Sequence, residues 1–143
     1  MSTVLVDTCV WYTIFDPRER PHERNAVNTL ADQIQAMTAV IPWPITYETL
    51  CTKFVKNRLA LKGFERLLKS PKVNILDDAP YREAALELSF NSSLRAGRPL
   101  SLTDCHLRVV IDSLDTRIRY LATYNVRDFH DVCTQRNVQV IPQ

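Results

Sequence analysis

The stretch Thr3-Val4-Leu5-Val6-Asp7-Thr8 near the N-terminus decides the fold. Its first four residues are β-branched or apolar, a short run typical of a buried strand. Asp7 ends this run and can cap a helix, which we expect to continue to Phe15 before Asp16-Pro17 ends it. A buried strand that turns directly into a helix is the opening unit of an α/β fold.

The same alternation of strand and helix continues along the chain. Further strands are predicted at Thr38–Pro42, Lys72–Leu76, Ile118–Thr123 and Val138–Ile141. Apolar residues at helical spacing predict helices over Pro21–Met37, Ile45–Asn57, Leu59–Lys69, Pro80–Ala96 and Ser101–Leu114, and a short one within Tyr124–Phe129. This order predicts an α/β fold of three layers, α/β/α, with a central parallel sheet that helices cover on both faces.

Length and composition indicate one globular domain spanning residues 1–143. The chain has 143 residues, 45% of them apolar and 24% charged, enough to bury roughly 70% of the unfolded surface. The start of the chain lacks a signal-peptide pattern and no stretch has the apolar length of a membrane span. The four cysteines are too widely spaced for a zinc or redox pair, so we expect a cytoplasmic protein with reduced thiols.

The net charge of +2 is small, but the basic residues are unevenly distributed. Between Lys53 and Lys72 the chain carries seven basic residues and a single acid, Glu65. Such a stretch can attract a polyanion such as nucleic acid, or it can simply form a solvated helix surface.

Three carboxylates stand out, although each also has an ordinary structural explanation. Asp7 follows the first strand and can cap the next helix. Ser101 and Asp104 form a partial capping box, and helical spacing places Asp104 near an apolar face. Glu48 lies inside a predicted helix, at the edge of an apolar stripe made of Tyr47, Leu50, Cys51 and Phe54. Taken singly, each acid has a cap or helix-border role as an alternative to a functional one.

A fourth polar cluster follows the strand that ends near Thr123. Asn125 can cap the short helix that comes next, and Asp128 falls in the first turn of that helix. Most of these polar residues stand where a strand or loop enters a helix, so we expect them at one edge of the sheet. Two carboxylates about 4 Å apart repel by about 4 kcal/mol at an effective dielectric near 20. Converging acids therefore need protons or a cation, and oxygen ligands favour Mg²⁺ or Mn²⁺.

These motifs resemble those of the PIN domain family, and within it the small bacterial VapC-type toxins. The matching segments are Val4–Thr8, Thr46–Leu50, Ser101–Cys105 and Leu121–Phe129, in the family's order and over nearly the whole chain. The resemblance implies a parallel sheet between helices and an Mg²⁺- or Mn²⁺-dependent endoribonuclease that hydrolyses RNA phosphodiester bonds. It further implies the toxin of a bacterial type II toxin–antitoxin pair, with an antitoxin protein as partner and a possible homodimer.

The resemblance also implies roles for individual residues. Asp7 and Asp104 match the principal metal ligands, Glu48 a further ligand, and Thr8 a hydroxyl that helps to hold substrate or water. The last motif departs from the family pattern, because Asn125 stands where an aspartate is common. Asp128, three residues later, is the alternative source of that carboxylate. Both are therefore candidate catalytic residues beside the three acids.

Other interpretations remain open at this stage. A PIN-like module that binds RNA with little or no catalysis is the main alternative, favoured by the uncharged Asn125. A phosphate-accepting receiver domain has a similar size, but it requires an acidic pair after the first strand and a lysine after a late one. Trp11, Tyr12, Phe15 and Trp43 are candidates for an antitoxin groove or a dimer contact, or for the core. The cysteines near the acids, and His106, are expected to be structural.

Overall fold

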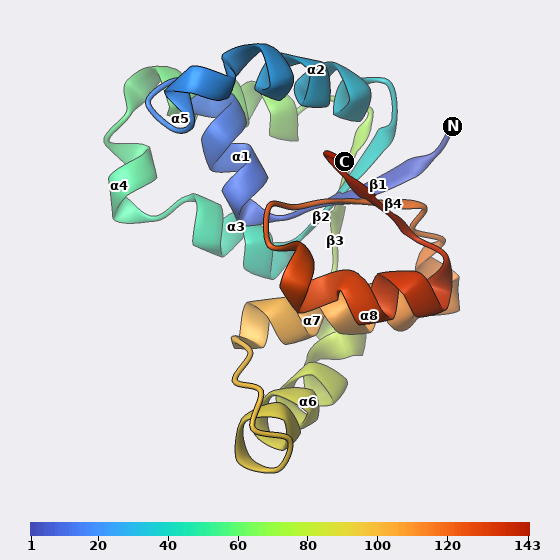
Figure 1. The fold of residues 1–143 in the computed structure, drawn as a ribbon. Helices are drawn as coiled ribbons and strands as arrows, with labels where there is room; N and C mark the ends of the chain where they lie inside the picture. The colour runs from blue at the N-terminus through green and yellow to red at the C-terminus, as the bar shows by residue number, and fades with distance from the viewer.

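The structure, a computed structural model, describes all residues from 1 to 143 and has a five-stranded sheet at its centre (Figure 1). All strand pairs are parallel, as predicted. The strand order is β3-β2-β1-β4-β5. The strands are β1 (Thr3–Val6), β2 (Thr38–Pro42), β3 (Val73–Leu76), β4 (Tyr120–Ala122) and β5 (Gln139–Ile141).

The central strand β1 divides the sheet into two halves. The chain first builds β2 and β3 on one side of β1 and then places β4 and β5 on the other side. Ligands of open parallel sheets bind where the strand order reverses in this way, beyond the carboxyl ends of the strands. Here that position lies between the ends of β1 and β4. The order also differs from the 2-1-3-4-5 order of receiver domains, so the receiver interpretation is excluded.

Helices cover both faces of the sheet, which confirms the predicted three layers. Figure 1 shows α1, α2 and α5 on one face and α7 and α8 on the other, with α6 packed outside α7. The helices are α1 (Thr8–Phe15), α2 (Arg24–Gln35), α3 (Trp43–Thr49), α4 (Thr52–Val55), α5 (Arg58–Leu68), α6 (Arg82–Leu94), α7 (Leu102–Asp112) and α8 (Val126–Arg136). Short 3₁₀ turns span Pro21–Glu23, Ala79–Tyr81 and Leu114–Thr116. None of the helices combines the length and apolar character needed to cross a membrane.

The core lies between the sheet and these helices. Val4, Leu5 and Val6 of β1 are completely buried, as the uninterrupted apolar run predicts for a central parallel strand. Beneath α1 and α5, Phe64 packs against Trp11 and Phe54 with ring centroids 6.1 and 5.9 Å apart. Of the aromatic residues considered for a partner groove, Trp11 therefore belongs to the core, whereas Trp43 is partly exposed and packs against Tyr47.

The single helix predicted over Ile45–Asn57 is wrong, because the chain forms two helices with a break at Leu50 and Cys51. The first begins at Trp43 because Pro44 sits in its first turn, where a missing backbone N–H costs nothing. At the break, the Tyr12 hydroxyl donates to the Glu48 carbonyl oxygen at 2.7 Å. This contact from α1 satisfies a carbonyl group that a continuous helix would have paired internally.

Two further expectations need correction. The apolar stripe assigned around Glu48 is wrong, because Tyr47 is 76% exposed and α3 instead buries Ile45, Thr46 and Thr49. The segment after β4 forms α8 over eleven residues, longer than the short helix expected within Tyr124–Phe129. Buried Val132 and Cys133 extend its apolar face, so packing against the sheet stabilises the additional turns of the helix.

Candidate active site at the carboxyl edge of the sheet

Asp7 stands at the point where the strand order reverses. Its backbone N–H donates to the Ala122 carbonyl oxygen at 2.9 Å, which joins the ends of β1 and β4. Its carboxylate caps α1 by accepting the Thr8 N–H at 2.8 Å. The second carboxylate oxygen accepts the Thr123 hydroxyl at 2.9 Å and lies 3.6 Å from the Cys9 sulfur. The capping role predicted for Asp7 is therefore present, and it leaves that second oxygen turned toward β4.

Burial governs the charge of Asp7. The residue is only 4% exposed, and this desolvation raises the pKa of its carboxyl group above the usual 3.8. The hydrogen bonds from Thr123 and Thr8 oppose the rise, and the charge of Glu48 adds to it. A buried carboxylate with a raised pKa at a sheet edge is a recognised mark of a functional site.

Asp104 lies in the first turn of α7, which Ser101 caps by accepting the Asp104 N–H at 3.0 Å. Its neighbours on the same helix face, Leu107 and Ile111, are buried, as the helical spacing predicts. Desolvation first, and then the charge of Asp7, raise the pKa of Asp104 to about 6. The two aspartates therefore interact electrostatically, although 97 positions separate them in the sequence.

Glu48 and Asp128 complete this acidic neighbourhood from two other helices. The charges of both residues contribute to the raised pKa of Asp104, and that of Glu48 also reaches Asp7. Glu48 is exposed near the end of α3, while Asp128 is half-buried in the first turn of α8. The structure thus gathers the four predicted acids in one region. No three of them, however, are placed closely enough to form a ready-made metal site.

Asn125 and Asp128 differ in how they face this region. Asn125 begins α8, but its exposed side chain makes no capping hydrogen bond, so the predicted capping role of its amide is wrong. Its backbone N–H donates to the Thr123 hydroxyl oxygen at 3.0 Å. Of these two residues, only Asp128 contributes a charge that acts on Asp104. Of the two candidates, Asp128 is the better placed to supply the fourth carboxylate.

Thr123 is the site residue that the sequence interpretation missed. It is completely buried directly after β4, where its hydroxyl donates to Asp7 and accepts from Asn125. The available signal was a small hydroxyl residue at the carboxyl end of a predicted strand, the position where sites of parallel sheets gather. Thr123 therefore fixes the orientation of the Asp7 carboxylate.

The remaining candidate residues are Thr8, His106 and the cysteines. Thr8 is buried beside Asp7, and its hydroxyl oxygen has no hydrogen-bond partner. His106 is buried and packs edge-on against Tyr81 with ring centroids 5.8 Å apart. All four cysteines are free thiols, and burial raises the pKa of Cys9 to about 11. A thiol that stays protonated at neutral pH is a poor nucleophile.

The donor set suits a hard divalent cation. All the charged groups are carboxylates, the ligands that Mg²⁺ and Mn²⁺ prefer, and no thiolate or imidazole competes with them. Mg²⁺ typically uses only one or two protein carboxylates and keeps several waters. Asp7 and Asp104 fit that requirement without a third protein ligand in place. The unpaired Thr8 hydroxyl beside Asp7 offers a further polar contact.

Comparison of the sequence with protein-family models and with curated proteins finds no match to either. The functional interpretation therefore rests on the geometry and charge of this site.

Proposed function

We propose that the chain is an Mg²⁺- or Mn²⁺-dependent endoribonuclease that hydrolyses RNA phosphodiester bonds. The observation that carries the proposal is the buried Asp7 carboxylate at the reversal of the strand order, coupled electrostatically to Asp104. Two acids with raised pKa values are stabilised in their charged form by a cation. When bound, a divalent ion lowers the pKa of water and neutralises charge on a phosphoryl group.

In the proposed reaction, each side chain of the site has a distinct role. Asp7 and Asp104 hold the cation, with Thr123 keeping the Asp7 carboxylate in place. Glu48, exposed at the rim on α3, orients the attacking water and accepts its proton. Asp128 supplies further negative charge from α8, and Thr8 offers a hydroxyl beside Asp7. No side chain needs to form a covalent bond with the substrate.

We extend the proposal to the biological role that the motif pattern implies. The chain acts as the toxin of a type II pair in the cytoplasm, and a small antitoxin protein inhibits it by covering the acidic edge. Growth of cells expressing the intact chain, compared with cells expressing the Asp104→Asn variant, tests this role. Growth arrest that requires Asp104 and is relieved by a protein encoded beside this gene supports it, whereas equal growth of both strains contradicts it.

The enzymatic proposal is tested with purified protein on a panel of single-stranded and structured RNAs. We expect cleavage with Mg²⁺ or Mn²⁺, none with a chelator, and a loss of at least about 100-fold in Asp104→Asn, because cation contacts supply several kcal/mol to such reactions. Asp115→Asn, an exposed aspartate outside the site, is the charge-matched control and should cleave normally. Metal-independent cleavage, or equal rates for both variants, contradicts the proposal.

An RNA-binding module without turnover is the second candidate, because no three acids form a preformed metal site. Calorimetric titration with Mn²⁺ separates the two functions. The nuclease should bind Mn²⁺ in a manner that depends on Asp7 and Asp104. A binding module should retain RNA affinity but show no carboxylate-dependent Mn²⁺ binding.

The hydroxyl of Thr123 provides a further prediction. In Thr123→Val, the Asp7 carboxylate loses the hydroxyl donor to its second oxygen and the Asn125 N–H loses its acceptor, with little change of shape. Residues that orient metal ligands typically contribute 10–100-fold to metal affinity, so we expect Mn²⁺ affinity to fall by about that factor. Calorimetry measures this directly, and Thr123→Ser, which keeps the hydroxyl, should restore binding. Unchanged Mn²⁺ affinity in the valine variant would show that Thr123 is not a positioning residue.

A further inference from the structure

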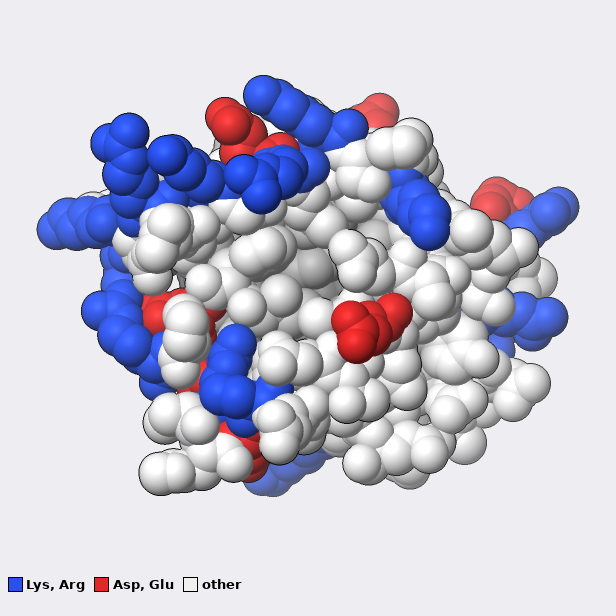
Figure 2. Space-filling view, turned by 90° about the horizontal axis from the view of Figure 1, so that it is seen from above, with Lys and Arg blue, Asp and Glu red and all other residues white.

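A basic hollow opens beside α4, and none of the four candidate acids lines it. It is lined by Arg18 from the loop after α1, by Thr52, Lys53 and Lys56 from α4 and its C-cap, and by Asn57, Arg58 and Leu59 at the start of α5. No carboxylate is among its lining residues. Figure 2 shows basic side chains gathered along the left of the molecule, the side on which α4 and α5 lie in Figure 1.

The cations of this hollow are unequally neutralised. The Arg18 guanidinium is held by Asp16, with Nε 3.0 Å and Nη2 3.1 Å from its two carboxylate oxygens. Lys53 reaches Glu19 at 3.9 Å, a long and exposed pair. Lys56 and Arg58 form no ion pair and are exposed. Two positive charges therefore face solvent without a partner, which favours an anionic ligand.

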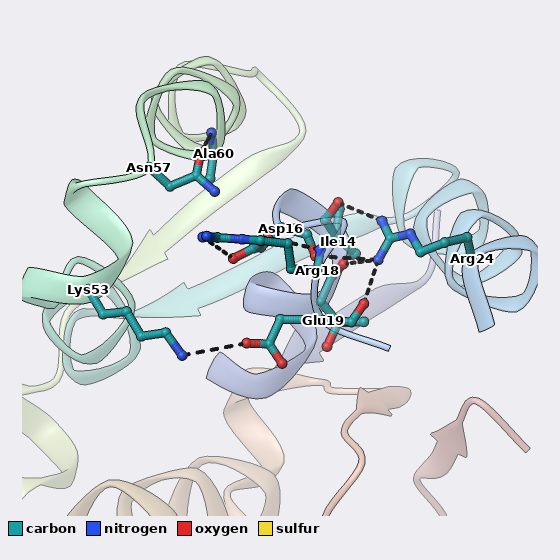
Figure 3. Close-up of polar contacts among 9 residues, drawn as sticks. Ile14, Asp16, Arg18, Glu19, Arg24, Lys53, Asn57 and Ala60 are labelled. Carbon is teal, nitrogen blue, oxygen red and sulfur yellow. Dashed lines mark hydrogen bonds and ion pairs between the residues drawn. The ribbon is translucent and has the colours of Figure 1, made fainter. Parts of the chain in front are cut away.

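The walls of the hollow are held in place. Arg24 donates through Nη1 to the carbonyl oxygens of Thr13 and Glu19 at 2.7 and 3.0 Å, which fixes the loop that carries Arg18. Asn57 caps α5 by accepting the Ala60 N–H at 3.1 Å. Figure 3 shows these contacts, with Arg18 extending from the loop toward the side of α4 and α5. A ligand would thus find the loop and the start of α5 already ordered.

The hollow and the acidic edge include residues of consecutive helices, because Lys53 belongs to α4 and Glu48 to α3. Tyr12 contacts both helices there, because its hydroxyl bonds the Glu48 carbonyl oxygen and lies 3.2 Å from the Cys51 sulfur. Tyr12, Cys51 and Lys53 also line a second, smaller depression, together with Asp16, Glu19 and Phe54. Lys53 belongs to both depressions. Lys53 is five positions after Glu48, so their Cα atoms lie at most about 18 Å apart.

We propose that the basic hollow binds the backbone phosphates of a single RNA strand whose scissile bond lies at the acids. This inference rests on the proposed function and adds a second contact region to it. One cation from the loop after α1 and three from residues 53–58 suit a few successive phosphates of one strand. The contact is indifferent to base identity because phosphates carry no sequence information.

The contribution of the hollow to cleavage should depend on the length of the RNA substrate. Remote phosphate contacts present in both the ground state and the transition state change KM and leave kcat unchanged. Lys56→Ala with Arg58→Ala should therefore raise KM for an RNA of about sixteen nucleotides by about tenfold. An RNA of about four nucleotides, at the lower end of known single-strand site sizes, should show no such change.

A binding experiment keeps the inference independent of turnover. Asp7→Asn protein is titrated with fluorescent single-stranded RNA of about sixteen nucleotides at several salt concentrations. In this background, removal of the Lys56 and Arg58 side chains should weaken binding by about tenfold and reduce the salt slope by about 0.7 for each phosphate that is no longer neutralised. The matched control, Lys69→Ala with Arg119→Ala, removes the same charge at the far end of α5 and at the entry of β4. It should retain nearly the full affinity.

The outcomes separate the two proposals. Equal weakening by both double variants would overturn the hollow and indicate diffuse attraction, as would unchanged affinity in the hollow variant. Selective weakening without any cleavage by the parent protein would overturn the nuclease and leave the hollow in place. If an acidic peptide competed with RNA only in protein with an intact hollow, this result would support the hollow as the anion-binding site. If the hollow variant bound RNA normally but no longer bound such a peptide, the RNA assignment would be wrong.

Discussion

Replacing Asp7 with asparagine is expected to lower metal-dependent RNA cleavage by at least about 1,000-fold, because a central charged ligand supplies several kcal/mol. The change is close to isosteric. The asparagine oxygen can still accept the Thr8 N–H, and its amide group can donate to the Thr123 hydroxyl oxygen. Initial rates under saturating Mn²⁺ measure the loss, and Asp115→Asn, exposed and outside the acidic edge, serves as the control for an equivalent charge change.

The same variant should be more stable than the parent protein. Since burial raises the folded-state pKa of Asp7, this group contributes stability only while protonated, and the contribution is lost as the pH rises from 3.8 through the folded-state value. Ionisation of this buried group therefore opposes folding, and asparagine, which cannot ionise, should increase the free energy of unfolding by about 0.5–2 kcal/mol. Urea denaturation without metal at pH 7 tests this. A folded variant with undiminished cleavage would remove Asp7 from the catalytic centre.

Phe64→Ala should produce the largest loss of stability, about 3–5 kcal/mol. The Phe64 ring is completely buried and contacts Trp11, Phe15 and Phe54 with centroid separations of 5.9 to 6.1 Å. Its removal leaves a cavity between α1, α4 and α5 that these rings cannot fill without moving. The melting temperature should fall by about 10–20 °C for a chain of this size.

Thermal unfolding followed by circular dichroism measures this effect. Leu59→Ala on the same helix is the matched control, because that side chain is 83% exposed and its truncation should change stability by less than about 0.5 kcal/mol. Phe64→Leu should recover much of the loss by refilling the cavity. A Phe64→Ala protein that unfolded within about 1 kcal/mol of the parent would contradict the central place given to this ring.

Most of the fold follows from local sequence patterns. The run Thr3–Val6 and the proline-bounded strand Thr38–Pro42 were predicted with the bounds that the structure shows, because buried parallel strands leave continuous apolar runs. Tertiary contacts decided the rest. The break between α3 and α4 involves Tyr12, which is distant in sequence, and α8 lengthens because its apolar face packs on the sheet. Neither effect can be seen in a local window.

The acidic residues of the candidate site were named from the sequence, but their arrangement in space was not predicted. The acids Asp7 and Asp104 stand out because each follows or opens a regular element, and the parallel topology brings such positions together. The spacing of the acids, which leaves no cluster of three, depends on how the helices are placed. The Thr123 hydroxyl was missed because threonine after a strand is common, and only the structure shows that it bonds Asp7.

The bond between Thr123 and Asp7 spans 116 positions in the chain. A growing polypeptide emerging from the ribosome would display its first aspartate long before the threonine, α8 and β5 have been synthesised. Any product truncated before β4 lacks both the neighbour of β1 and the hydroxyl that orients Asp7. Under the proposed nuclease function, this arrangement would delay activity until translation of the chain is almost complete.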